Sequence, residues 1–330
     1  NKQRKNMNNL KKIGLTALAA SLVSTSVFAG EVTVSGGASM AVEGYSGTAQ
    51  NAGKGFSMGN QLTFSGSGEL DNGLTASISF VLDQGDNETD TTAGAGTAPF
   101  DSHSVSISSD ALGTLTMHGE GGSNAAAALD TTAAGDIWDT FDNVAETTGA
   151  IVKTSTSGAD ILVYKLPSMV DDLSVSVSYS PQQAGAASST AYAATYTGVE
   201  GLSVSYGQGD ASTGVSTTEA DATTMKASYA YGSFTVAYSN NDYQSAVASS
   251  DQETTSYKLS YTVSDAISVS YGEETIDLEG STADAEYDKL SASYTSGGMT
   301  VTATQASATD ALHGTTTAED QDYWSLGLSF

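Results

Sequence analysis

Residues Asp71-Asn72-Gly73-Leu74-Thr75-Ala76-Ser77-Ile78-Ser79-Phe80-Val81-Leu82 join a tight turn to a segment of alternating polarity. The Asn-Gly pair supplies the positive φ angles that a short hairpin turn requires. Because successive side chains of a strand point to opposite faces, the apolar residues at even positions from 74 to 82 share one face, and Thr75, Ser77 and Ser79 share the other. This stretch therefore predicts a β-hairpin in a sheet with one apolar and one hydroxyl-rich face.

The same alternation recurs in about sixteen segments, from Glu31–Met40 at the start to Gln321–Phe330 at the end. The connections alternate between tight turns and longer, acidic loops rich in Ser, Thr and Gly. An even number of strands with loops of alternating length is typical of an outer-membrane β-barrel, with both termini in the periplasm. We therefore expect an all-β, 16-stranded antiparallel transmembrane barrel.

Tyrosines recur on one parity near the ends of the expected strands. The first group, expected at the outer rim, is Tyr179, Tyr206, Tyr238 and Tyr271. The second group, expected at the periplasmic rim, is Tyr196, Tyr229, Tyr261 and Tyr294. Two such rings match the aromatic girdles that a barrel places at the two membrane interfaces.

The alternation stops from Gly119 to about Ala159, and loops of this length inside a compact domain are uncommon and usually functional. Acids at positions 136, 139 and 142 share one face of a helical turn, and Ile137 and Phe141 lie on the other. We expect this third long loop to fold into the lumen and narrow it. The acids predicted to line the constriction are Asp130, Asp136, Asp139, Asp142 and Glu146.

The first 29 residues are expected to hold residues upstream of the start and a cleaved secretory signal, followed by the barrel at 30–330. Lys11 and Lys12 precede an apolar segment, Ile13–Phe28, and small residues place the cleavage between Ala29 and Gly30. Five of the 11 basic residues and none of the 38 acidic residues precede Gly30, so the mature net charge is about −32, without any Arg. This balance excludes nucleic-acid binding, which needs a basic surface.

The chain also resembles the general porins of alphaproteobacteria, of the Rhodobacter type. The resemblance rests on the order and spacing of four elements: Glu31–Met40, Gly73–Phe80, Leu112–Met117 with the long loop after it, and Tyr323–Phe330. It implies a homotrimer in the outer membrane, in contact with lipid and lipopolysaccharide. It also implies that Phe330 carries the C-terminal signal for the barrel assembly machinery. Such porins usually carry several Arg on the wall opposite the loop, and the mature chain has none.

Lysines could take the place of those arginines. Each stands between residues of outward parity, so period 2 directs it into the lumen. One interpretation is a cationic wall facing the loop acids across the constriction; the other is that these lysines only keep the lumen face soluble at different heights. The predicted pore-wall residues are Lys165, Lys226, Lys258 and Lys289.

No cofactor is required by this interpretation, although two acidic clusters could bind Ca²⁺ or Mg²⁺ through oxygen ligands. The clusters are Asp83, Asp86, Glu88, Asp90 and Glu273, Glu274, Asp277, Glu279, and solvated loops are the alternative for both. The chain has no Cys, and its Gly-x-Ser-x-Gly match, Gly55–Gly59, lies in an expected strand rather than at a strand-to-helix turn and without a Ser/His/Asp arrangement, which argues against an enzyme.

The sequence therefore predicts an outer-membrane diffusion porin for small hydrophilic solutes and ions, with a moderate preference for cations. A closed structural or adhesive barrel is the main alternative, and a barrel enzyme is a further one.

Overall fold

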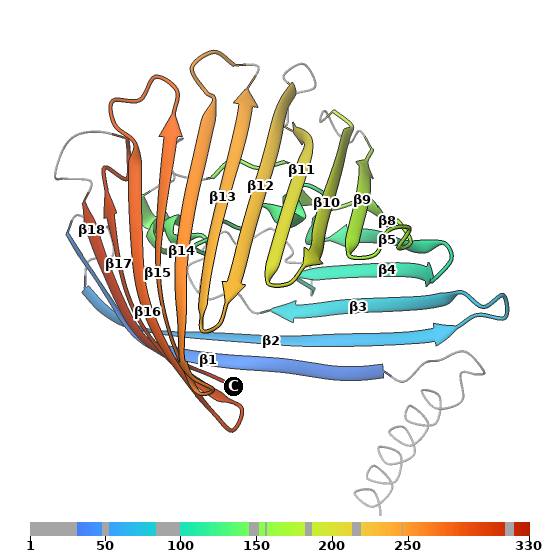
Figure 1. The fold of residues 1–330 in the computed structure, drawn as a ribbon, viewed down its shortest axis with the longest axis horizontal. Helices are drawn as coiled ribbons and strands as arrows, with labels where there is room; N and C mark the ends of the chain where they lie inside the picture. Colours follow the sequence, from blue (N-terminus) through green and yellow to red (C-terminus); the bar gives the residue numbers. More distant parts are fainter. Residues whose placement is uncertain are drawn as a thin grey trace, which may run out of the picture.

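The computed structural model describes residues 32–47, 53–83, 100–144, 152–155, 157–181, 187–212, 219–245, 247–313 and 320–330. Sixteen antiparallel strands form one closed barrel, which confirms the predicted fold (Figure 1). The barrel strands are β1 (Val32–Gly47), β2 (Gly53–Glu69), β3 (Thr75–Asp83), β4 (Ser102–Ser109), β5 (Gly113–Glu120), β8 (Ile161–Lys165), β9 (Leu173–Ser180), β10 (Ser189–Val199), β11 (Leu202–Ser212), β12 (Glu219–Tyr231), β13 (Phe234–Ser245), β14 (Gln252–Ser264), β15 (Ile267–Leu278), β16 (Ala285–Ser296), β17 (Met299–Thr309) and β18 (Gln321–Ser329).

The barrel closes where the first and last strands pair. β1 and β18 run antiparallel from Gly47↔Gln321 to Ser39↔Ser329. The last residue extends this seam, because Phe330 and Ala38 exchange backbone hydrogen bonds of 3.0 and 2.9 Å. Closure leaves no free sheet edge, which is the condition for strands to cross a bilayer.

The outer face of the barrel is apolar. Residues of one parity, such as Ile78 on β3 and Val236 on β13, are 41% and 50% exposed. Ser77 and Ser79, on either side of Ile78, have the opposite parity and face the lumen. This exposure would be unfavourable in water and suits a lipid environment. No helix in the described ranges is both long and apolar enough to cross a membrane.

The second tyrosine group, expected at the periplasmic rim, lies where the strands meet the short turns. Tyr196, Tyr229, Tyr261 and Tyr294 pair with Leu173, Leu202, Phe234 and Ile267, each the first residue of a neighbouring strand. This places the ring beside the short turns. At one of these turns Gly201 has φ +76°, and a Cβ atom there would lie 2.3 Å from the Ala230 carbonyl oxygen.

The first tyrosine group does not end its strands as expected. Only Tyr179 lies at a strand end, since β11, β13 and β15 continue for six or seven residues beyond Tyr206, Tyr238 and Tyr271. The outward positions of these extensions are polar, for example Asn240 and Asp242 after Tyr238. Because these positions are polar, the sequence pattern resembles a loop there, although the backbone pairing of the strands continues.

The buried apolar core of the described residues lies inside the barrel, where the long loop packs against the wall. The larger cluster joins loop residues Ile137 and Phe141 to Ile276 on β15 and Tyr287 on β16. Figure 1 shows this loop in green within the ring of strands. The third long loop therefore folds into the lumen, as predicted.

Candidate functional site

The base of the loop is a short two-stranded sheet, β6 (Gly122–Ser123) with β7 (Ser157–Gly158). Beside it, the Asn124 side chain organises the first turn. Its Oδ1 accepts hydrogen bonds from the backbone N–H groups of Ala126 at 2.9 Å and Ala127 at 2.8 Å, before the 3₁₀ helix η1 (Ala127–Leu129). It also accepts from the Ser155 hydroxyl at 2.9 Å, which joins the outgoing and returning parts of the loop.

Serine hydroxyls of the wall hold the loop backbone along its course. The N–H groups of Ala125, Ala133 and Ala134 donate to the hydroxyl oxygens of Ser178, Ser239 and Ser256 at 2.9, 2.8 and 2.9 Å. These serines stand on β9, β13 and β14, so the loop follows the wall across many strands. Burying backbone donors is tolerable only when each finds an acceptor, and here the lumen face supplies it.

Two wall glycines let the loop approach closely. A Cβ atom at Gly207 would lie 3.0 Å from Cα of Ala126, and one at Gly272 would lie 2.7 Å from Cβ of Ala134. Small residues on both sides of this contact allow backbone to pack against backbone. The run of alanines in the loop is explained by this close packing.

A second 3₁₀ helix, η2 (Ile137–Val144), buries the apolar face that the sequence predicts. Ile137 and Phe141 are 0% and 2% exposed. Asp136 is not part of this helix: it precedes it with φ 48°, and its Oδ1 accepts a hydrogen bond from the N–H of Thr132 at 2.8 Å. Asp136 therefore does not belong to the expected helical face of acids, because it closes a turn before the helix.

The start of η2 is capped by a carboxylate of the barrel wall, Glu274, which the sequence indicates only as part of an acidic cluster. Glu274 on β15 is 1% exposed and accepts hydrogen bonds from the Thr132 hydroxyl and from the N–H of Trp138, the latter at 3.1 Å. The N–H groups at the start of a helix have no partner within the helix and carry partial positive charge. Glu274 therefore fixes both the turn and the helix to the wall.

Two of the four predicted lysines contact the loop directly. Nζ of Lys226 on β12 donates to the Thr131 carbonyl oxygen, and Nζ of Lys289 on β16 donates to the Gly135 carbonyl oxygen at 3.2 Å. They face the lumen, as period 2 predicts, but they do not face the loop across an opening. The expectation of an opposing cationic wall is therefore wrong for these two, because the loop lies against the strands that carry them.

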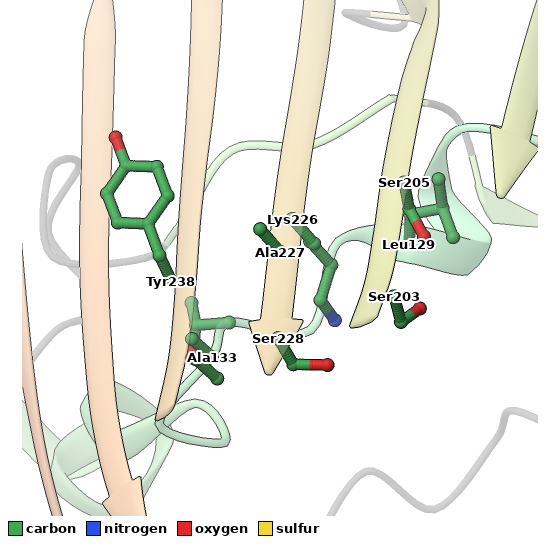
Figure 2. A pocket seen from close by; sticks show the side chains of 10 residues that line it. Leu129, Ala133, Ser203, Ser205, Lys226, Ala227, Ser228 and Tyr238 are labelled. Carbon is green, nitrogen blue, oxygen red and sulfur yellow. The ribbon is translucent and has the colours of Figure 1, made fainter. Parts of the chain in front are cut away.

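Lys226 extends into a cavity of about 300 Å³ between the loop and the wall. Figure 2 shows the side chains that line it. The hydroxyls of Ser203, Ser205 and Ser228 line it from β11 and β12, and Leu129 and Ala133 line it from the loop. The ammonium group thus lies beneath the loop among hydroxyls.

The other lysines have different surroundings. Lys165 is the last residue of β8, pairs with Thr114 at the end of the strand away from the loop, and is exposed. Lys258 on β14 is half-buried and faces the lumen between the strands of Lys226 and Lys289. A further lysine, Lys153, lies in the loop and is not indicated by strand parity. Its Nζ donates to the Ser250 carbonyl oxygen at 3.2 Å.

The described loop acids remain accessible to different degrees. Asp139 is exposed, whereas Asp130 and Asp136 are half-buried. Burial raises the pKa of the Asp130 carboxyl above its ordinary value, and the negative charge of Asp136 acts in the same direction. The Asp142 side chain and Glu146 lie outside the described residues, as do Ala29 and Gly30.

A comparison with protein families decides what kind of barrel this is. The model of the Gram-negative porin family matches residues 14–287. The chain belongs to this family. Its membership and its fold imply an outer-membrane channel rather than an enzyme.

Solved structures of other porins share the barrel. An anion-selective porin from Comamonas acidovorans has 17% sequence identity and a TM-score of 0.62, with 91% of this chain and 99% of that chain covered. A triple mutant of the Rhodopseudomonas blastica porin has 16% identity and the same TM-score and coverage. At these identities the likeness shows the fold alone. The search of curated proteins found no match.

In this porin the second acidic cluster of the sequence analysis, from Glu273 to Glu279, does not converge on one point. Glu274 faces the lumen, whereas Glu273 and Asp277 have the opposite parity on β15. Within the described ranges, no group of three or more His, Asp or Glu side chains could hold a metal ion. Of the first cluster, only Asp83 lies in the described part of the chain.

Proposed function

We propose that this porin forms a water-filled channel for passive diffusion of small hydrophilic solutes and ions, with a moderate preference for cations. The observation that supports it most directly is the acid-bearing loop held inside a closed barrel by Ser178, Ser239, Ser256 and Glu274. In this proposal the loop, held by fixed contacts to the wall, narrows the aqueous path.

The cation preference rests on the placement of charge. In the described strands β1–β5 the only Lys or Arg is Lys54, and its Nζ lies over the ring of Trp324 at 6.0 Å, on the outer face. The lysines beneath the loop, Lys226 and Lys289, bond to loop carbonyls. Fixed acidic charge raises the local concentration of cations, and Lys226 offsets part of the charge of Asp130 and Asp136. The Comamonas porin is anion-selective, so selectivity differs among barrels of this fold.

Planar-bilayer recording of the purified protein tests the proposal. Sustained open steps are expected, with a reversal potential of cationic sign in a KCl gradient. Replacing Asp136, Asp139 and Asp142 by Asn should reduce that potential. A correctly folded barrel without conductance would instead support the structural barrel, and an anionic reversal potential would refute the cation preference.

The proposal includes export and assembly. Cleavage after Ala29 would release the barrel, Phe330 would be read by the barrel assembly machinery, and the outer face would contact lipid and lipopolysaccharide. We also propose a homotrimer, because the outer face of β1 and β2 combines small residues such as Gly36 with exposed apolar ones such as Phe56, which is 89% exposed. Native-size measurement in mild detergent tests this, and a monomer under all conditions would contradict it.

A further inference from the structure

Glu43 stands on the lumen face of β1, at the seam of the barrel. Its neighbour Val42 is 37% exposed on the outer face, and a Cβ atom at its other neighbour, Gly44, would lie 2.6 Å from Nε1 of the outward-facing Trp324. Because parity alternates along a strand, the Glu43 side chain points into the barrel. It is half-buried, so water reaches its carboxylate.

A short chain of contacts connects Glu43 to the loop helix η2. The Tyr323 hydroxyl donates to Oε2 of Glu43 at 2.9 Å, and the Tyr323 ring packs on the Tyr45 ring with centroids 4.8 Å apart. The Tyr45 hydroxyl then donates to the Thr140 carbonyl oxygen at 3.1 Å. The residue before Thr140 is the exposed acid Asp139. A wall acid and a loop acid are thus held on either side of one contact between wall and loop.

In the part of the chain that the structure describes, Glu43 has a hydroxyl donor and no basic partner. Lys226 on β12 and Lys289 on β16 donate hydrogen bonds to carbonyl oxygens of the loop. Its charge is therefore fixed in place by Tyr323 and is not cancelled by a nearby ammonium group. A fixed, half-exposed carboxylate in an aqueous path attracts cations and repels anions.

We propose that Glu43 is a selectivity-determining residue of the constriction and acts on small inorganic and organic cations together with Asp139. This inference rests on the proposed channel function. Glu43 supplies negative charge from the barrel seam, and Asp139 supplies it from the loop. A cation that passes alongside the contact between the seam and η2 interacts with both, because charges closer than the Debye length of about 8–10 Å at physiological salt are only partly screened.

The test compares two variants that each lose one charge on neighbouring strands. Glu43→Gln keeps a carbonyl acceptor for Tyr323 and removes the charge from the lumen. Asp322→Asn removes a charge on β18 next to Tyr323, but Asp322 pairs with Ser46 and has outward parity. In a KCl gradient, Glu43→Gln should lower the K⁺/Cl⁻ permeability ratio about two-fold, and Asp322→Asn should leave it unchanged. Equal ratios in the two variants would overturn the proposal.

A double-mutant cycle tests the cooperation with Asp139. Asp139→Asn alone should lower the ratio, and the combined variant should lower it by less than the product of the two single effects, because the two carboxylates act on the same ion. A strictly multiplicative effect would overturn the joint action. If the unmodified protein gives no conductance, the channel function itself fails; if it conducts but Glu43→Gln does not change selectivity, only this inference fails.

Discussion

The backbone N–H of Trp138 in the loop donates a hydrogen bond of 3.1 Å to the Glu274 carboxylate on the wall, 136 residues further along the chain. A helix normally receives its cap from a residue just before it. In this porin the residue before η2 is Asp136, whose Oδ1 is already bonded by the N–H of Thr132. The wall therefore supplies the cap, and the position of the constriction depends on a strand residue.

Replacing Glu274 by Ala should loosen the loop. The Trp138 N–H and the Thr132 hydroxyl would lose their acceptor. A buried donor left without a partner lowers the free energy of unfolding by about 1–3 kcal/mol. We expect larger current fluctuations and additional conductance levels in single-channel recording. Glu273→Ala is the matched control, because Glu273 has outward parity and accepts a hydrogen bond from the Tyr271 hydroxyl at 2.8 Å rather than from the loop. Identical traces for the two variants would contradict the role of Glu274.

Replacing Gly272 by Ala should displace the loop from the wall. The new methyl group would lie 2.7 Å from Cβ of Ala134, which is too close for two carbon atoms. Overpacking of this kind costs about 1–3 kcal/mol. We expect a lower unfolding temperature and an altered conductance. The control is Gly327→Ala, where the nearest atom would be 3.8 Å away and neither property should change.

The barrel could be predicted from the sequence because period 2 sets the face of every strand residue. Parity placed Ile78 outside and Lys226 inside, and both placements hold in the structure. The upper strand ends could not be predicted in this way. Above Tyr238 the outward residues Asn240 and Asp242 are polar, so the local pattern resembles a loop while the backbone ladder continues.

The candidate site was less predictable because it depends on where the loop docks. Parity directs a lysine into the lumen but does not tell which strands the loop covers, so Lys289 looked like a residue opposite the loop rather than one beneath it. Closeness in sequence groups Glu274 with Glu273 in an acidic cluster, but neighbouring residues of a strand point to opposite faces. Only the register separates it from Glu273.

Two lysines of the lumen face, Lys258 and Lys226, should differ in their effects. Lys258→Gln removes a cation from the lumen face and should raise the K⁺/Cl⁻ permeability ratio without disturbing the loop. Lys226→Gln should raise the ratio too, but it also weakens the hydrogen bond to the Thr131 carbonyl oxygen. We therefore expect added current noise only for Lys226→Gln. Equal noise in both variants would show that Lys226 does not hold the loop.

The last prediction concerns Asp130 and pH. Burial raises the pKa of its carboxyl, and the neighbouring charge of Asp136 also raises it, while contacts with Thr154, Thr131 and Lys226 oppose the shift. As pH falls from neutral, Asp130 should therefore be protonated before ordinary exposed carboxyls, and the cation preference should begin to fall at a correspondingly higher pH. Asp130→Asn should remove this first step from a plot of reversal potential against pH.

The same shift has a defined sign for stability. A carboxyl whose folded pKa is raised binds its proton more tightly in the folded state, so its charged form destabilises the fold above that pKa. The penalty disappears as pH falls through the raised value. Asp130→Asn should therefore increase the unfolding temperature at neutral pH, and the increase should shrink as the solution is acidified. An increase that is independent of pH, or a first step that persists in the reversal potential of the variant, would show that Asp130 does not titrate in this way.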